Sequence, residues 1–258
     1  MFIFLILLSN SYSAELPYHQ SIEEISKQFL GVPYVLDPLG EGKHGSIDTD
    51  PLYRFDQFDC TTYVETVIAL SRSKTQDEFA KNMNEIRYST GEPDYFKRNH
   101  FIEVDWMPSN IQKGIVEDVT AGLFDSKILK TAHTKIDKRS WYKQKKKTSP
   151  VGEKPIPVTL TYLPLDQIID HPKLLDQIPS GTFFNLIKVK SHSLGLVVHQ
   201  GVLVRNEGIL LARHATKLSR DQVVEMNALG LFRMYFRNQE SEGVKSAGLN
   251  FFKKLNSL

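Results

Sequence analysis

The sequence predicts an α+β fold in which an antiparallel β-sheet packs against a helix that begins at Cys60. Three observations support this prediction. Helical patterns come first along the chain, extended patterns come later, and two of the extended segments are joined by a tight turn that contains glycine. Helices and strands that are segregated along the chain, rather than alternating, are typical of the α+β class.

Two short helices are expected from their N-terminal sequences. Residues 21–24 (SIEE) form a capping box, in which a serine and a glutamate satisfy free backbone groups of the first turn, and this box opens a helix that extends to Phe29. Residues 75–78 (TQDE) repeat the pattern and open a second helix that extends to Tyr88.

A third helix is expected to begin at Cys60. Asp59 is a good N-cap residue, which places Cys60 at the first helical position. Val64, Val67 and Ile68 then follow helical spacing from the cysteine. The helix should therefore direct the sulfur toward a packed interior or a cleft.

The later part of the chain predicts strands. Residues 159–163 (TLTYL) alternate, and residues 183–190 follow a Pro-Ser-Gly turn at 179–181. Residues 194–205 and 209–216 are predicted to form a hairpin, because a glycine lies in the short connection between them.

Composition narrows the class of protein. The 258 residues include 32 Lys and Arg, 30 Asp and Glu, and one cysteine, for a net charge of +2. A chain with 41% hydrophobic residues has enough apolar side chains for a core and is not a disordered protein. The balanced charge does not indicate nucleic acid as a partner. One cysteine excludes zinc clusters built from paired cysteines.

The domain organisation is predicted from the two ends of the chain. Residues 2–8 (FIFLILL) are too short to span a bilayer but resemble a secretory signal cleaved after Ser13, with a misassigned start as the alternative. We therefore expect residues 1–13 to be a signal peptide and residues 14–258 to form one catalytic domain of an exported protein, periplasmic or secreted. Loop insertions are expected at about 87–150. A C-terminal extension at 239–258 is expected to be a docked helix or a frayed tail.

The lone cysteine suggests chemistry. An exported protein with one cysteine cannot form an internal disulfide, so Cys60 is a buried residue, an intermolecular bridge or a nucleophile. The free N–H groups and the positive end of a helix N-terminus favour a thiolate. The position therefore predicts a nucleophile with a lowered pKa. A core cysteine is the alternative.

A thiol nucleophile needs a base, which is normally histidine. If the hairpin turn centres between Asn206 and Glu207, His199 lies directly opposite His214, within hydrogen-bonding reach. We expect His199 to take the thiol proton and His214 to orient the His199 ring. Two histidines on a half-exposed hairpin are the alternative, and His192 is a rival base.

Residues 87–110 mix charged and aromatic side chains. Arg98, His100, Asp105 and Trp106 are predicted to form a platform, on which arginine binds a carboxylate and tryptophan covers a sugar. The alternatives are a structural loop with a buried tryptophan, and a zinc site formed by His100 with the two hairpin histidines.

The motifs and their order resemble a known family. The relevant segments are Phe29-Leu-Gly-Val-Pro-Tyr34, Pro38-Leu-Gly-Glu-Gly42, Phe58-Asp-Cys-Thr-Thr-Tyr-Val-Glu65, Arg98-Asn-His-Phe101, Asp105-Trp106, Asn110, Ile178-Pro-Ser-Gly181, His199-Gln-Gly201 and Arg213-His-Ala-Thr216. Together they resemble the NlpC-type cell-wall cysteine peptidases, a papain-like superfamily, and more narrowly its N-acetylmuramoyl-L-alanine amidase-like branch. The resemblance covers residues 21–237.

The resemblance implies a function. Cys60 would be the nucleophile, His199 the base and His214 the residue that orients it, with no metal and no organic cofactor. The reaction would be hydrolysis of the amide between N-acetylmuramic acid and L-alanine of the stem peptide. Peptidoglycan or muropeptide fragments would be the partners, with no nucleic acid and no stable membrane insertion after signal removal. Substrate binding is assigned to Tyr34 (from the resemblance alone), Asp59, Arg98, His100, Asp105 and Trp106.

Three departures from the wider family pattern bear on specificity. Thr61-Thr62 replaces Ser-Gly after the cysteine, which fits the narrower branch, while Gln200 and Thr182 replace the more usual Val and Asp. Two other functions stay open. One is a stem-peptide endopeptidase that cuts between D-glutamate and the diamino acid, and the other is a non-catalytic protein that binds the cell wall.

Overall fold

The structure, a computed structural model, describes residues 18, 20–145, 154–189, 195–218, 221–238, 244 and 246–255. Its helices are α1 (Ile22–Gln28), α2 (Cys60–Ser71), α3 (Gln76–Arg87), the π-helix η1 (Ile102–Trp106), α4 (Met107–Gln112), α5 (Thr120–Leu123), the 3₁₀-helix η2 (Ser126–Ile128), α6 (Lys138–Gln144), α7 (Leu165–Asp170), the 3₁₀-helix η3 (Pro172–Gln177) and α8 (Ala228–Arg237). Its strands are β1 (Val116–Asp118), β2 (Lys130–Ile136), β3 (Ile156–Pro164), β4 (Thr182–Val189), β5 (Val197–Asn206), β6 (Ile209–Thr216), β7 (Gln222–Asn227) and β8 (Ser246–Lys254).

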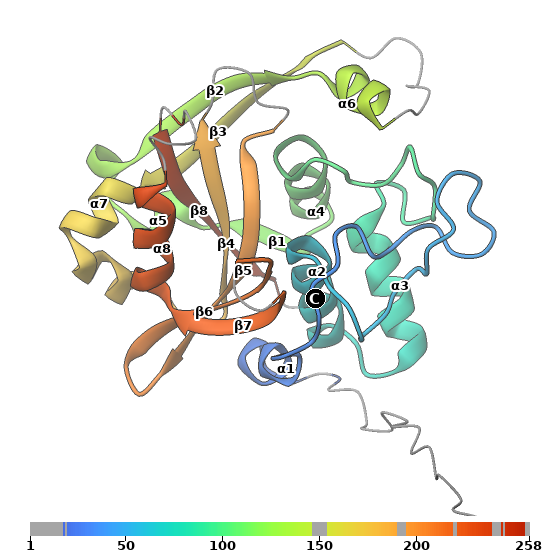
Figure 1. The fold of residues 1–258 in the computed structure, drawn as a ribbon, viewed down its shortest axis with the longest axis horizontal. Coiled ribbons are helices and arrows are strands. Elements are labelled where there is room, and N and C mark those ends of the chain that lie inside the picture. The colour runs from blue at the N-terminus through green and yellow to red at the C-terminus, as the bar shows by residue number, and fades with distance from the viewer. Residues whose placement is uncertain are drawn as a thin grey trace, which may run out of the picture.

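The strands form one antiparallel sheet, so the predicted α+β class is confirmed. The strand order is β2-β3-β8-β4-β5-β6-β7, and β1 pairs with the C-terminal end of β8. All the pairings are antiparallel. Helices α1–α4 lie on one side of this sheet, and α5, α7 and α8 lie on the other (Figure 1).

Each face of the sheet has its own hydrophobic core. Phe183, Val202 and Phe252 point toward α2 and join the core that α1–α3 complete. Phe184 and Leu203, on the opposite face of the same strands, pack with α7 and α8. The period-two alternation along β4 and β5 therefore places successive side chains in different cores.

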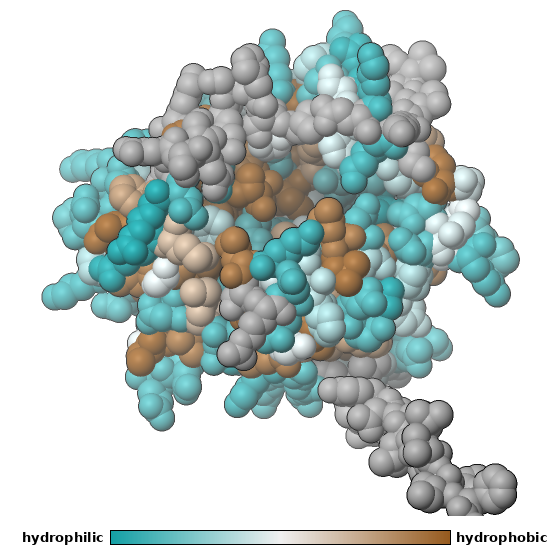
Figure 2. Space-filling model, in the orientation of Figure 1, coloured by the Kyte–Doolittle hydropathy of each residue, from teal (hydrophilic) through white to brown (hydrophobic). Residues whose placement is uncertain are grey.

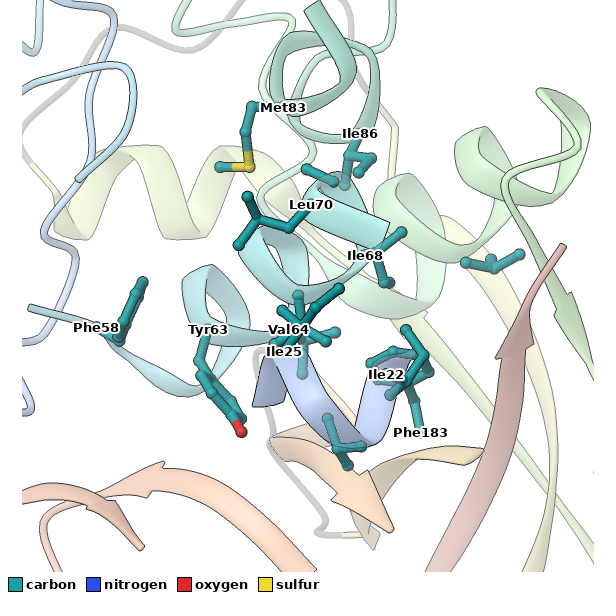
Figure 3. Close-up of a cluster of buried hydrophobic side chains, with 14 of the residues drawn as sticks. Ile22, Ile25, Phe58, Tyr63, Val64, Ile68, Leu70, Met83, Ile86 and Phe183 are labelled. Carbon is teal, nitrogen blue, oxygen red and sulfur yellow. The ribbon is translucent and has the colours of Figure 1, made fainter. Parts of the chain in front are cut away.

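Helix α2 is the centre of the first core. Ten of its 12 residues, Thr62 to Ser71, are buried. Val64, Ile68 and Leu70 contact side chains from α1, α3 and β4 in this core (Figure 3). A helix that is buried all round has its position determined by packing on every face, so its N-terminal residue is held in place as well.

Several sequence predictions are confirmed. The capping box at Ser21 is present, and Thr75 caps α3 as expected. Asp59 caps α2, and Cys60 is the first helical residue. The alternating segment at 159–163 lies within β3, and the segment that begins at 183 lies within β4.

The prediction for the C-terminal segment was wrong. Residues 246–254 form neither a docked helix nor a tail but β8, which lies between β3 and β4 in the sheet. Leu249 and Phe251 enter one core and Phe252 the other. Apolar residues at 249, 251, 252 and 255 fit a helix as well as a strand, and only the pairing with β4, which is distant in sequence, decides between them.

Residues 87–150, which we expected to be loop insertions, contain η1, α4, α5, α6 and the strands β1 and β2. The predicted signal peptide at 1–13 and the rival base His192 lie outside the described residues. Among the residues that the structure does describe, no helix has the length and apolar character needed to cross a membrane.

Candidate functional site

Asp59 fixes the start of α2. Its Oδ1 accepts hydrogen bonds from the backbone N–H of Thr62 at 2.7 Å and from the Thr62 hydroxyl at 2.9 Å. Its Oδ2 accepts from the backbone N–H of Asp37 at 3.2 Å, which ties the loop before Pro38 to the helix. Asp59 was predicted to bind substrate, and these bonds give its carboxylate a structural task beside the half-buried Cys60.

The β5–β6 hairpin has a different register from the predicted one. The turn is Glu207–Gly208, with φ of 48° and 81°, so Val202 pairs with Arg213. His199 and His214 are therefore not directly opposite. A slip of two residues leaves every side chain on its expected face. Glu207 adopts a positive φ without being glycine, and the turn centres one residue later than the position that would place the two histidines directly opposite each other.

The two histidines nevertheless meet, as expected. Nε2 of His199 lies 2.7 Å from Nδ1 of His214. Their contact is made possible by Gly201, because a Cβ at this position would lie 2.7 Å from the Arg213 carbonyl oxygen. The glycine lets the two strands approach closely just where the pairing ends.

The strands β5 and β6 separate beyond the Val202–Arg213 pair, and the start of α2 lies beside the part of β5 that β6 no longer covers. The backbone N–H of Gln200 and the Thr61 hydroxyl lie close enough to the Cys60 sulfur to act on its pKa. In the described structure, the Cys60 sulfur makes no hydrogen bond to the His199 ring, although Cys60 and His199 line the same pocket.

The thiol of Cys60 is neutral at physiological pH. Burial raises its pKa to about 12, and the neighbouring Asp59 carboxylate adds to the rise. The hydrogen bonds from Gln200 and Thr61 act in the opposite direction but do not cancel it. The prediction of a thiolate stabilised by the helix N-terminus was therefore wrong, because desolvation outweighs the helix end.

Both histidines are neutral as well. Burial lowers the pKa of His214 to about 4. Burial, together with His214 and Lys188, lowers the pKa of His199 well below its usual value. Nε2 of His214 is buried without a protein partner in the described chain. Within the described residues, the His199–His214 hydrogen bond is thus the only one that either ring makes.

A pocket of about 340 Å³ opens beside the sulfur. Its lining residues are Asp37, Asp59, Cys60, Thr61, Thr62, Glu65, Arg87, Arg98, Asn99, His100, Phe101, Ile102, Glu103, Trp141, Gly195, Val197, Val198, His199 and Gln200. Most of these side chains are polar or charged, so the pocket is suited to a hydrated ligand rather than to an apolar one. Figure 2 shows a hollow near the centre of this face, bordered by hydrophobic side chains.

Arg98 belongs to an ion-pair cluster at the pocket. Its guanidinium contacts Glu41 at 2.6 Å, Asp48 at 2.7 Å and Asp37 at 3.4 Å, and it also donates to the Leu39 carbonyl. The neighbouring carboxylates raise the pKa of Arg98 against the effect of burial. The donors that were predicted to bind a substrate carboxylate are therefore already used within the protein.

Trp106 does not form the predicted sugar platform. Its side chain is fully buried, and its indole N–H donates to Oε1 of Glu65 at 3.0 Å. The other oxygen of Glu65 accepts from Arg87 at 2.8 Å. Trp106 is thus a core residue that orients a buried ion pair, which was the alternative interpretation of this segment.

His100 lines the pocket, whereas Asp105 does not. Nε2 of His100 donates to the Tyr95 carbonyl at 2.7 Å, and its ring packs against Trp141. Burial lowers the pKa of His100 to about 3, and Arg98 contributes. Asp105 instead accepts from Lys138 at 2.5 Å. Within the described residues, no three His, Cys, Asp or Glu side chains are grouped as a metal site.

Tyr34 lies near the sulfur but outside the lining of the pocket. Its pKa is raised to about 12, first by burial and then by Cys60 and Asp59. Lys217 lies over its ring, 5.7 Å from the centroid. The structure therefore gathers Cys60, Asp59 and Tyr34 at one end of α2.

Sequence reasoning missed four charged residues of the pocket, which are Asp37, Glu65, Arg87 and Glu103. Asp37 adopts a positive φ of 54°, and Glu103 accepts from the backbone N–H groups at the start of β5. Neither has a local sequence signal. Glu65 and its partner Arg87 did have one, because a glutamate within the apolar run from Val64 to Leu70 is buried and needs a partner.

Fold and site together define an α+β protein whose polar cleft combines a helix-terminal cysteine with a pair of histidines. The chain belongs to the N-acetylmuramoyl-L-alanine amidase-like family, whose match spans residues 24–240.

Solved structures share this fold. A Legionella pneumophila protein of the DUF1460 family is 25% identical, with a TM-score of 0.80, over 91% of this chain and 88% of that one. Two structures of an N-acetylmuramoyl-L-alanine amidase from Bacteroides uniformis are 22% and 24% identical, each with a TM-score of 0.70 over 92% of this chain and 99% and 98% of theirs. No curated protein matches the chain.

Proposed function

We propose that this protein is an exported thiol-dependent hydrolase of peptidoglycan that cleaves the amide between N-acetylmuramic acid and L-alanine. The observation that carries the proposal is that Cys60, at the start of α2, and His199 line one polar pocket, while His214 is hydrogen-bonded to His199 behind it. Membership of the amidase-like family supports the choice of bond.

In the proposed reaction, Cys60 is the nucleophile and His199 is the base. Because Nε2 of His199 is engaged with His214, Nδ1 is the nitrogen that is free to take the thiol proton. Since thiol and imidazole are both neutral at rest, the proton moves as the sulfur attacks the lactyl carbonyl, rather than beforehand.

His214 supports the charge that this transfer creates. A neutral His214 presents Nδ1 as an acceptor, so the Nε2–H of the His199 imidazolium keeps its hydrogen bond during the reaction. His214 thus orients the ring and stabilises its protonated form without being protonated itself. The His199 imidazolium then donates its Nδ1 proton to the L-alanine nitrogen, which leaves as an amine.

The oxygen that becomes negative in the tetrahedral intermediate needs donors. The backbone N–H of Cys60, at the start of α2, is one. The Tyr34 hydroxyl, near the sulfur, is assigned as the second, since its raised pKa keeps its proton in place. Water then attacks the muramoyl thioester, with His199 acting again as the base, and frees Cys60.

The pocket supplies the remaining recognition. Asp59 and Asp37 lie on its rim beside the sulfur, while Glu65 and Arg87 contribute to its lining. Such a polar pocket is suited to the hydroxyl, amide and carboxylate groups of a muropeptide. Export follows from the predicted signal at residues 1–13, and it would place the enzyme in the periplasm or outside the cell, where peptidoglycan is found.

Mass spectrometry of muropeptides incubated with wild type and with Cys60→Ala tests the proposal. We expect wild type to release the sugar and a stem peptide with a new L-alanine N-terminus, and Cys60→Ala to release neither while it stays folded. The change removes only one sulfur from a half-buried position, so circular dichroism and the melting temperature should match those of wild type.

Two other results would contradict the proposal. Cleavage between D-glutamate and the diamino acid would keep the thiol mechanism but identify an endopeptidase. Turnover by purified Cys60→Ala would exclude Cys60 as the nucleophile.

A further inference from the structure

A chain of buried amide side chains crosses the centre of the sheet. Nε2 of Gln200 on β5 donates to Oδ1 of Asn185 on β4 at 2.8 Å, and Nδ2 of Asn185 donates to Oδ1 of Asn250 on β8 at 3.0 Å. Nδ2 of Asn250 donates to Oδ2 of Asp118 on β1 at 2.7 Å, and to the Thr120 hydroxyl at 2.9 Å. We call these four residues, Gln200, Asn185, Asn250 and Asp118, the amide ladder.

The three amide residues are an unusual set for this position. All are buried, and both Gln200 and Asn250 are directly paired with Asn185 in register. Their neighbours along the same strand faces, Phe183, Val202 and Phe252, form the core beneath α2. Buried amides cost free energy unless they are hydrogen-bonded, so polar residues here need a reason beyond packing.

The ladder has a fixed direction. An ionised Asp118 can only accept, so Asn250 must present its amide nitrogen to it and its oxygen to Asn185. Asn185 in turn presents its oxygen to Gln200. The exposed carboxylate at the far end, together with the Thr161 carbonyl oxygen that also accepts from Asn250 Nδ2 at 3.3 Å, therefore sets the direction of every amide along the ladder. Three interstrand steps of about 4.8 Å place it roughly 14 Å away from β5.

The other end of the ladder lies at the nucleophile. Gln200 follows His199 in sequence, and both residues line the same pocket as Cys60. This part of β5 is not paired with β6, because pairing between the two strands stops at Val202. In the described structure, β4 is the strand that pairs with β5 at His199 and Gln200, and the hydrogen bond between the Gln200 and Asn185 side chains adds to that pairing.

We propose that the amide ladder is a positioning device for the candidate site, in which Asp118 and the ladder amides hold β5 so that His199 and Gln200 stay in place beside Cys60 at the pocket. This inference rests on the proposed role of Cys60. His199, the proposed base, is carried by this stretch of β5, and the Gln200 N–H lies near the sulfur on which negative charge develops. Asn185, Asn250 and Asp118 lie outside the lining of the pocket and act through Gln200 and the backbone of β5.

Two variants test the ladder at different depths. Asn185→Leu has a similar volume but breaks the ladder at its centre and leaves Nε2 of Gln200 without an acceptor. Asp118→Asn keeps the shape of a side chain that lies at the surface, but it removes the charged acceptor at the end of the ladder. Glu117→Gln is the matched control, since Glu117 is the adjacent carboxylate on β1 and pairs only with the exposed Lys253.

We expect Asn185→Leu to lower kcat for muropeptide hydrolysis by about 10-fold or more with KM nearly unchanged, because small displacements of a reacting group are costly. Asp118→Asn should lower kcat by about 3-fold, since its ladder can still form in either direction. In both variants the Gln200 amide proton, followed by NMR, should exchange faster with solvent, and Cys60 should be alkylated more slowly by iodoacetamide at a fixed pH. Glu117→Gln should change none of these.

The exchange and alkylation readouts need no muropeptide, so they decide the inference even if the amidase proposal fails. If Asn185→Leu does not fold, Asp118→Asn decides it alone. Unchanged kcat, Gln200 exchange and Cys60 alkylation in folded variants would overturn the proposal. So would losses of activity that match the fraction of unfolded protein, because the ladder would then be merely structural.

Discussion

The pocket is bordered by two buried polar clusters of opposite character. On one side, Glu65 with Arg87, and Glu41 with Arg98, are charged groups whose partners lie at 2.6–2.8 Å. On the other side, the thiol and the two imidazoles are neutral and share one hydrogen bond between them. The first cluster is nearly saturated with partners and the second is not.

The difference separates stability from chemistry. In the ion-pair cluster every charged group is paired with an opposite charge, and Arg87 Nε and Glu41 Oε2 are its buried atoms without a partner in the described chain, so the cluster shapes the pocket and holds α2, α3 and the loop at 37–48 together. The under-bonded cluster keeps Nδ1 of His199 and the sulfur available, and burial keeps them neutral until substrate arrives. Groups with shifted pKa values at one pocket can therefore have either a structural or a catalytic role, and the hydrogen-bond and ion-pair partners of each group show which role it has.

The largest expected effect is on the catalytic side. His199→Ala should lower kcat/KM for muropeptides by roughly 10³-fold or more, because the neutral thiol loses its base. The free energy of unfolding should fall by only about 1–3 kcal/mol, from the cavity and the unpaired Nδ1 of His214, which is too little to account for such a loss of activity. Steady-state kinetics with urea unfolding measure both. A parallel fall of activity and stability would contradict the separation of the two clusters.

The next effect is on the structural side. Glu65→Leu should lower the free energy of unfolding by about 3–5 kcal/mol, because Arg87 is left buried without its partner. The double variant Glu65→Leu, Arg87→Leu should recover much of this loss, since no unpaired charge remains. Urea unfolding of the single and double variants measures the difference. Equal destabilisation of both would show that the charge pairing is not the cause.

A smaller effect is expected from pH. Burial lowers the pKa of His214 from 6.5 to about 4, so as pH falls the unfolded chain takes up this proton before the folded protein does. The contribution of neutral His214 is therefore complete above about pH 6.5 and is lost as pH falls toward 4, by on the order of 3 kcal/mol.

Unfolding in urea at several pH values, for wild type and His214→Gln, isolates this contribution. The difference in stability between the two proteins should shrink or change sign below pH 6. A difference that is independent of pH would show that His214 does not titrate in this way.

Local signals predicted most of the helical part. Caps at Ser21, Asp59 and Thr75 are encoded within four residues, and all three are found. The place of Cys60 and the meeting of His199 with His214 could be predicted for the same reason, since a capped helix and a hairpin are short-range structures.

What could not be predicted depends on distant contacts. The thiolate prediction failed because Cys60 is desolvated by β5, which is about 140 residues away in sequence. Trp106 and Arg98 looked like exposed binding residues until Glu65 and Glu41 were seen to engage them. The strand at 246–254 was missed because its pattern is ambiguous until it pairs with β4.

The most direct test of the account is the pH dependence of Cys60 alkylation by iodoacetamide. If the site stores a neutral thiol beside a neutral imidazole, the rate is low at pH 7 and rises steadily beyond pH 9 without a plateau, because burial raises the pKa of Cys60 to about 12. A rate that reaches its plateau below pH 7 would show a thiolate–imidazolium pair already formed at rest, and would contradict the account.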